Sequence, residues 1–190
     1  MLGTSKEIKN PGLNILPPGV ERHVVNGGAL TAFQIFPDDE LEIINNEGNQ
    51  ICEIICFNKD GKSDAGILNL KTNNDKNFIR SILNGKDETI LATNHQLKKR
   101  NLNISDSKSS IIFDLDTKAG ESIKLKSRDK CYAIFAAPSE DMDVTNQNPP
   151  SDLTIFIKRS KIVNDKELNV IPDPIFEPLY EENINKETSI

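Results

Sequence analysis

A single carboxylate stands inside the apolar run ICEIICF that covers residues 51–57. Side chains alternate along a strand, so Glu53 shares one face with Ile55 and Phe57, and both faces of the run are mostly apolar. An unpaired carboxylate in such surroundings is unfavourable unless it is hydrogen-bonded, paired with a cation, bound to a metal or protonated. Glu53 is therefore the polar residue that most constrains the fold. A β architecture has to enclose its carboxyl group and supply a compensating partner.

A second β-type run, at 41–44, precedes this one, and the turn-forming sequence NNEGN lies between them. This pattern predicts a hairpin with a loop longer than the tightest type. Other alternating or apolar runs predict further strands. These strands cover 29–36, 111–115, 122–126, 131–137 and 152–158.

The middle of the chain changes to helical spacing of its apolar residues. A helix is predicted over roughly residues 75–84, followed by a second over 88–99 with Ile90, Leu91 and Leu97 pointing inward. The predicted fold class is mainly β (α+β). It is a two-sheet sandwich or small distorted barrel with one or two helices inserted in the middle.

The proline-containing ends suggest three regions in the chain. Residues 1–19 are predicted to form an extended N-terminal arm, residues 20–160 the β-sandwich domain, and residues 161–190 a linker or docking tail. The formal charge of −6 argues against nucleic acid as a partner, because no excess of cations exists to neutralise phosphates. No apolar run approaches the ~20 residues that span a bilayer, so a cytoplasmic protein without a membrane partner is expected.

The three cysteines are predicted to be reduced thiols that are buried as small hydrophobes. Cys52 and Cys56 would lie ~13 Å apart on a strand, whereas a disulfide needs Cα atoms within roughly 7 Å. That separation also prevents both thiols from converging on one tetrahedral zinc. At most one of them can meet Cys131.

His23 is one of two histidines and would form an acid/base or metal pair with Glu53 if the fold joined them. A packed or surface histidine is the other interpretation. Four acidic residues near the start of the 41–44 run resemble a metal cluster only in composition, and alternation predicts a solvated edge instead. They are Asp38, Asp39, Glu40 and Glu42.

Short motifs also resemble a known family. Gly48-Asn49-Gln50, followed by Glu53 three residues later and then by Phe57-Asn58, resembles the strand motif of the urea-carboxylase-associated domain family. Glu53 stands where that family usually has aspartate. From Pro18-Gly19 to Pro172-Asp173-Pro174 the chain is similar to the N-terminal region of aminomethyltransferase-like proteins of the trimethylamine-N-oxide demethylase type, so the resemblance spans nearly all 190 residues.

The resemblance implies a module of a one-carbon enzyme. In that family the sandwich module releases formaldehyde from an amine oxide, and a tetrahydrofolate domain resembling the glycine-cleavage T-protein captures it. The folate domain is thus an implied partner, in the same longer chain or as a separate polypeptide, and a homo-oligomer is expected. The family's metal-binding cysteines have no matching positions here, so zinc or iron stays open and no residue is assigned as a metal ligand.

Two functions fit these observations. In the first, which we favour, the chain is a structural or assembly module, and Glu53 is satisfied by an internal partner such as Arg22 or backbone amides. The alternative is a stand-alone, metal-dependent enzyme acting on a small methylated amine, with the activity of a carbon–nitrogen lyase or demethylase. In that enzyme Glu53 would act as the general acid or base, or as a metal ligand. Gln50 would orient the substrate, and His23 or Asp152 would assist.

Overall fold

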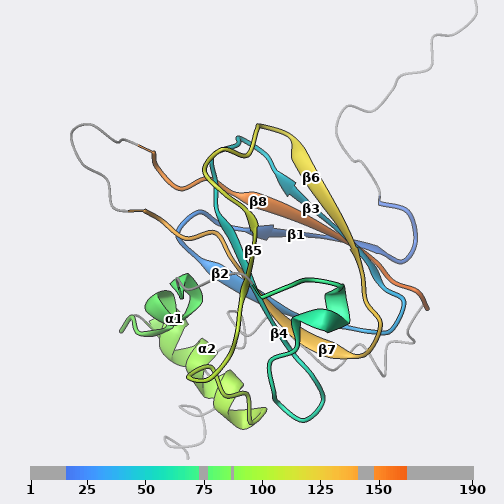
Figure 1. The fold of residues 1–190 in the computed structure, drawn as a ribbon, viewed down its shortest axis with the longest axis vertical. Helices are drawn as coiled ribbons and strands as arrows, with labels where there is room; N and C mark the ends of the chain where they lie inside the picture. The colour runs from blue at the N-terminus through green and yellow to red at the C-terminus, as the bar shows by residue number, and fades with distance from the viewer. Residues whose placement is uncertain (1–15, 73–76, 87, 141–147, 162–190) are drawn as a thin grey trace, which may run out of the picture.

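The computed structural model describes residues 16–72, 77–86, 88–140 and 148–161. Eight strands in these ranges form two four-stranded antiparallel sheets that face each other (Figure 1). The first sheet has the order β1 (Val20–Val25), β8 (Leu153–Lys158), β3 (Glu40–Asn45) and β6 (Glu121–Lys126). The second has the order β2 (Leu30–Ile35), β7 (Cys131–Ala136), β4 (Cys52–Phe57) and β5 (Ser110–Phe113).

This strand order is that of an eight-stranded, double-sheet jelly roll, in which the chain passes repeatedly from one sheet to the other. Three helical segments lie between β4 and β5, and two of them, α1 and α2, cover the outer side of the second sheet (Figure 1). The helical segments are η1 (Ala65–Leu68), α1 (Phe78–Leu83) and α2 (Glu88–Lys99). The prediction of a two-sheet sandwich with helices inserted in the middle is confirmed.

All six residues of β4 are buried, because its side chains alternate between two faces and each face is covered by other residues. Ile54 and the cysteines face the core between the two sheets, together with residues such as Phe135. Ile55 and Phe57 face a second core that the sheet forms with the helices, where Ile79 and Leu97 meet them. The strand therefore has an apolar layer on each side, as the run at 51–57 predicted.

The predicted hairpin between residues 41–44 and 51–57 is wrong. β3 pairs with β6 and β8 in the first sheet, whereas β4 pairs with β5 and β7 in the second. The intervening residues cross from one sheet to the other, and Asn45 stabilises the crossing. Its side chain donates to the carbonyl of Gln50 at 2.8 Å and accepts from the amide of Gly48 at 3.0 Å.

Helix α2 has the predicted bounds, but its predicted inward face is only partly correct. Leu97 is 2% exposed and packs in the second core, Ile90 is half-buried, and Leu91 is 55% exposed. The helix is rotated so that Thr93, Gln96 and Leu97 are its buried residues, which places Leu91 on the outer side. The prediction for Leu91 is therefore wrong.

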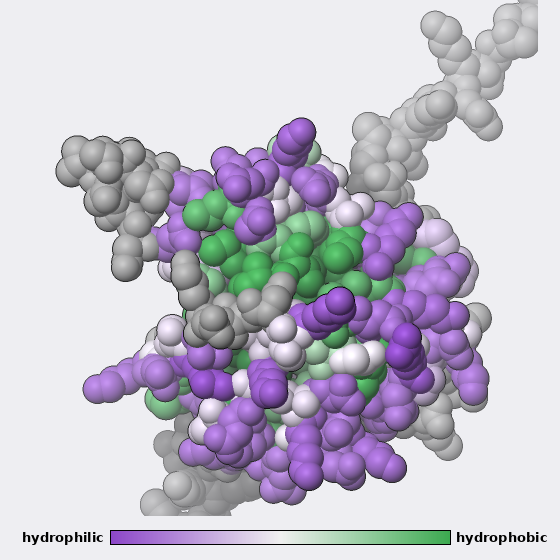
Figure 2. Space-filling model, in the orientation of Figure 1, coloured by the Kyte–Doolittle hydropathy of each residue, from purple (hydrophilic) through white to green (hydrophobic). Residues whose placement is uncertain are grey.

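The sandwich is less completely covered beside its edge strands β5 and β6. Figure 2 shows apolar side chains gathered in this part of the surface. Ile112 and Ile123 are partly buried against the inter-sheet core, and Leu115 is 38% exposed. Most of the predicted arm (1–19) and nearly all of the predicted tail (161–190) lie outside the described residues, so both stay predictions. Within the described ranges, the helices are too short or too polar to cross a bilayer.

Candidate functional site

Glu53 lies on β4 beneath helix α1 and is completely buried. Its Oε2 accepts a hydrogen bond from the backbone amide of Ile79 at 2.6 Å. Ile79 is the second residue of α1, where backbone amides have no partner inside the helix. Asn77, at the N-cap position, makes no capping bond with its side chain. The carboxylate of Glu53 therefore takes that role and joins the helix to the sheet.

Gln50 and Asp152, the two predicted substrate-binding residues, lie together at one end of the sandwich. The Gln50 amide nitrogen donates to the carbonyls of Ile51 and Pro138 at 3.0 and 2.9 Å. Its oxygen accepts from the backbone amide of Ser151 at 2.7 Å. Gln50 is 3% exposed, and its bonds to Pro138 and Ser151 connect the start of β4 to the segments that follow β7 and precede β8.

Asp152 extends this network to the turn before β2. One of its carboxylate oxygens accepts from the backbone amide of Gly27 at 2.9 Å, and its carbonyl accepts from the side chain of Asn46 at 3.0 Å. The chains approach closely here, since a Cβ on Gly27 would lie 2.5 Å from the carbonyl oxygen of Pro150. Gln50 and Asp152 thus connect four segments, which lie before β2, at the start of β4, after β7 and before β8.

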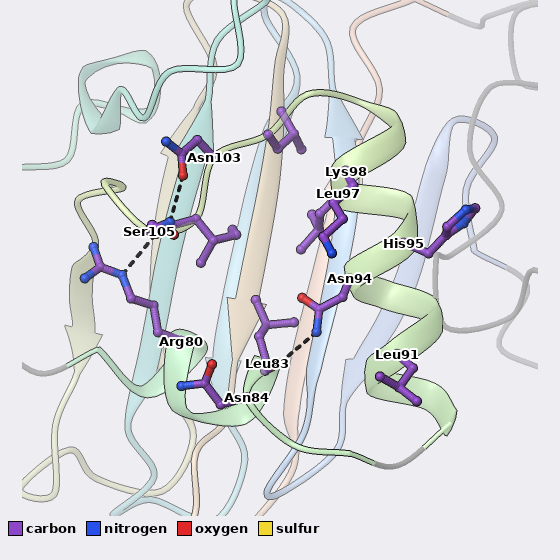
Figure 3. A pocket seen from close by; sticks show the side chains of 12 residues that line it. Arg80, Leu83, Asn84, Leu91, Asn94, His95, Leu97, Lys98, Asn103 and Ser105 are labelled. Atoms are coloured by element: carbon purple, nitrogen blue, oxygen red, sulfur yellow. Dashed lines mark hydrogen bonds between the residues drawn. The ribbon is translucent and has the colours of Figure 1, made fainter.

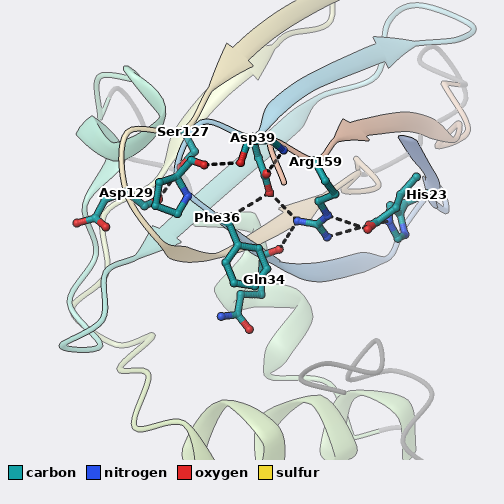
Figure 4. Close-up of polar contacts among 10 residues, drawn as sticks. His23, Gln34, Phe36, Asp39, Ser127, Asp129 and Arg159 are labelled. Carbon is teal, nitrogen blue, oxygen red and sulfur yellow. Dashed lines mark hydrogen bonds and ion pairs between the residues drawn. The ribbon is translucent and has the colours of Figure 1, made fainter. Parts of the chain in front are cut away.

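His23 belongs to a charged cluster at another part of the sandwich (Figure 4). Its Nε2 lies 3.0 Å from a carboxylate oxygen of Glu21, and its ring centroid is 4.2 Å from that of Phe33. Arg159, just after β8, donates two hydrogen bonds to Glu21, at 2.7 and 2.8 Å. This two-pronged geometry is the strong form of an arginine–carboxylate pair.

The same guanidinium binds a second acid, Asp39, at 2.8 Å. Asp39 is only 1% exposed and also accepts from the backbone amides of Phe36 and Ser160, at 3.0 and 2.9 Å. The predicted solvated edge is therefore wrong for Asp39. Its turn folds inward because Arg159 and two amides supply enough donors to compensate for its burial.

This cluster was missed in the sequence because its members are far apart in the chain. Arg159 lies 138 positions from Glu21 and 120 from Asp39. The only local signal was an acid just after a proline turn and an arginine directly after a strand. Neither signal specifies a partner, because pairing between them depends on the strand order.

The charged cluster changes the protonation of Glu21. Burial raises the pKa of its carboxyl, but hydrogen bonds from His23 and Arg159 outweigh this and lower the pKa from 4.5 to about 2. Burial likewise lowers the pKa of Arg159, and its bonds to Glu21 and Asp39 reverse that effect and raise it. The cluster therefore holds Glu21 as a carboxylate in moderately acidic solution.

We expect this protonation difference to make stability depend on pH. The unfolded chain binds a proton at Glu21 below about pH 4.3, whereas the folded chain binds it only near pH 2. The contribution of Glu21 is thus present above pH 4.3 and is lost as the pH falls to about 2. Urea unfolding measured between these values should show a shallower pH dependence for Glu21→Gln, and parallel curves would contradict the assignment.

The structure does not bring His23 and Glu53 together. The His23 ring contacts Phe33, whose side chain is in the core between the sheets. Glu53 shares its face of β4 with Ile55, in the core under the helices. The second sheet therefore separates the two predicted catalytic residues, and they do not form the acid/base pair that the sequence left open.

The three cysteines are free and buried, and all point into the inter-sheet core. Burial raises the pKa of Cys52. The hydrogen bond between Cys56 and Cys131, together with burial, raises the pKa of the Cys56 thiol. Cys56 is thus the one that meets Cys131. Among the described residues, no three histidine, cysteine or acidic side chains come together as a group that would hold a metal ion.

Surface cavities lined by described residues lie elsewhere on the molecule. One, of about 760 Å³, lies beside α1 and α2, and another, of about 710 Å³, lies over the outer face of the first sheet. None of the four predicted site residues lines either cavity. Glu53 and Gln50 are instead enclosed by protein and bonded to backbone groups.

Comparison with known proteins gives one informative similarity. No family model matches the chain. The chain is 29% identical over 182 residues to the trimethylamine-oxide aldolase of Ruegeria pomeroyi. The match covers 96% of this chain and 23% of that protein, so the chain spans less than a quarter of its relative's length. The resemblance expected from the sequence is confirmed, and the kinship to urea-carboxylase-associated domains stays a prediction.

Proposed function

We propose that this chain is a structural or assembly module of a longer one-carbon enzyme related to trimethylamine-oxide aldolase. The observation that carries the proposal is the bonding of Glu53, Gln50 and Asp152. Each of these side chains binds backbone groups of a different segment and so connects parts of the fold. Side chains used in this way stabilise a scaffold, and the buried polar atoms of Glu53 and Gln50 face protein rather than a substrate.

The extent of the similarity supports the same conclusion. A relative whose match covers 96% of this chain devotes more than three quarters of its own length to other parts. The family resemblance implies that one such part is a folate domain, so tetrahydrofolate would enter the reaction there. This chain would then supply a rigid neighbour for that domain, and its predicted homo-oligomerisation would hold several copies together.

The proposal is tested by assaying the purified chain for formaldehyde release from trimethylamine N-oxide, with and without added zinc or iron. We expect no release above the background without protein. We also expect Glu53→Gln to change the melting temperature, because it weakens the bond to Ile79. Glu40→Gln is the matched control, since Glu40 is an exposed acid on β3.

The stand-alone enzyme predicts the opposite pattern. Formaldehyde would be released in a metal-dependent manner, and Glu53→Gln would abolish the release while the melting temperature stayed near that of the unmodified protein. That result would overturn the assembly role.

A further inference from the structure

The cavity beside the helices is a groove with two walls (Figure 3). One wall is a face of α2 whose residues follow helical spacing, and the other is formed by the end of α1 and the segment 102–105. The α2 residues are Leu91, Asn94, His95, Leu97 and Lys98. The groove has a volume of about 760 Å³, enough to receive several side chains of a peptide.

Hydrogen bonds hold the walls in place. Nε of Arg80 donates to the carbonyl of Ile104 at 3.0 Å, and Nη2 donates to the carbonyl of Ser107. Asn94 reaches across to the carbonyl of Leu83 at 2.7 Å, as Figure 3 shows. The groove is therefore formed before any occupant binds, which lowers the entropic cost of binding.

The groove combines apolar surface with positive charge. Leu91 is the most exposed of the large hydrophobic residues that the structure describes, at 55%, and Leu97 and Ile104 also line the cavity. Arg80 and Lys98 are its charged residues, and no aspartate or glutamate is among the described residues that line it. The positive charge of the groove contrasts with the net charge of the whole chain, which is −6.

The same chain contains an acidic segment with apolar residues, which complements the charge and the apolar surface of the groove. Residues 162–190 carry seven carboxylates and two lysines, so they hold −5 of the net charge of −6. Within them, the segment 171–182 (IPDPIFEPLYEE) has four carboxylates and no lysine or arginine. Its acids alternate with large apolar residues, among them Phe176, Leu179 and Tyr180. An acidic segment with large apolar side chains is complementary to this groove, whose lining is partly apolar and whose charged residues, Arg80 and Lys98, are cationic.

The length of the chain permits the contact. The described chain ends at Lys161, and Ser160 is fixed there by hydrogen bonds to Asp39 and to the carbonyl of Pro37. Fifteen residues lead from Lys161 to Phe176, and they can extend over about 50 Å. A domain of this size has a radius of gyration of only about 15 Å, so the segment can reach either side of it.

We propose that residues 171–182 bind in the groove between α1 and α2 of their own chain. Phe176 and Leu179 contact the apolar side chains that line the groove beside Leu91, and the neighbouring glutamates face Lys98 and Arg80. Whatever follows residue 190 in a longer protein would then leave from the helical side of this module. The inference does not depend on the proposed function, because a catalytic chain could bind its own tail in the same way.

The chain contains no tryptophan, so Phe176→Trp introduces a single tryptophan as the reporter in the full-length protein. If the segment is bound, tryptophan emission is shifted to the blue and protected from acrylamide quenching. Lys98→Glu in the same background should move the emission to that of a solvated tryptophan, because the added charge repels the acidic segment. About 1 M NaCl, where the screening length is near 3 Å, should shift it in the same direction.

Matched variants separate this contact from a general charge effect. Lys118→Glu, in the exposed turn before β6, should leave the emission unchanged. Glu177→Lys combined with Lys98→Glu should restore the blue shift, and far-ultraviolet circular dichroism should show that each variant is folded.

Three results would overturn the proposal. The first is a solvent-like emission in the parent Phe176→Trp protein, and the second is a blue shift that Lys98→Glu does not alter. The third is a blue shift that grows with protein concentration, because the groove would then bind the tail of a second copy.

Discussion

Replacing Arg159 with alanine is expected to lower the free energy of unfolding by about 3–5 kcal/mol. The guanidinium binds Glu21 through two hydrogen bonds and Asp39 through a third, and Asp39 is 1% exposed. Removing one partner of a buried ion pair leaves the other charge without compensation. The two backbone amides that Asp39 also binds reduce this penalty but do not neutralise the carboxylate.

Urea unfolding with linear extrapolation measures the loss. Arg128→Ala is the matched control, because Arg128 is exposed and its replacement should change stability by no more than about 0.5 kcal/mol. Combining Arg159→Met with Asp39→Asn removes both charges and should cost less than the sum of the single changes. A single loss below about 1 kcal/mol for Arg159→Ala would show that the cluster contributes no more than a surface ion pair.

Alternation and helical spacing were sufficient to predict most elements of this fold. The bounds of α2 agree with the prediction, and the run at 51–57 is buried on both faces as its composition required. These features depend on neighbouring residues, because side-chain direction repeats every two residues in a strand and every 3.6 in a helix. The enclosure of Glu53 followed from the same local rule.

The partners of each element could not be predicted in this way. β3 and β4 follow each other closely, yet they belong to different sheets, and β3 pairs with a strand more than 75 residues away. A strand exposes the same hydrogen-bonding groups to any neighbour, so periodicity does not select one. The Arg159 cluster was missed for the same reason, since it forms only when the end of β8 meets the turn after β2.

Glu53→Ala is expected to destabilise the protein by about 2–3 kcal/mol and to loosen α1 from the sheet. The substitution removes the acceptor oxygen and leaves the amide of Ile79 buried without its bond to Glu53. Ile79 is itself fully buried, so water cannot readily replace the lost oxygen. Relief from burying the carboxylate offsets part of this loss, which is why the expected value stays below that for Arg159.

Hydrogen exchange separates a local effect from a global one. The Ile79 amide should lose protection in Glu53→Ala, whereas Glu53→Gln retains an acceptor oxygen and should preserve much of it. Glu40→Ala is the control, since the ion pair of Glu40 with Lys158 is at the surface and contributes little. If α1 stays protected in Glu53→Ala, the carboxylate is not what holds the helix to the sheet.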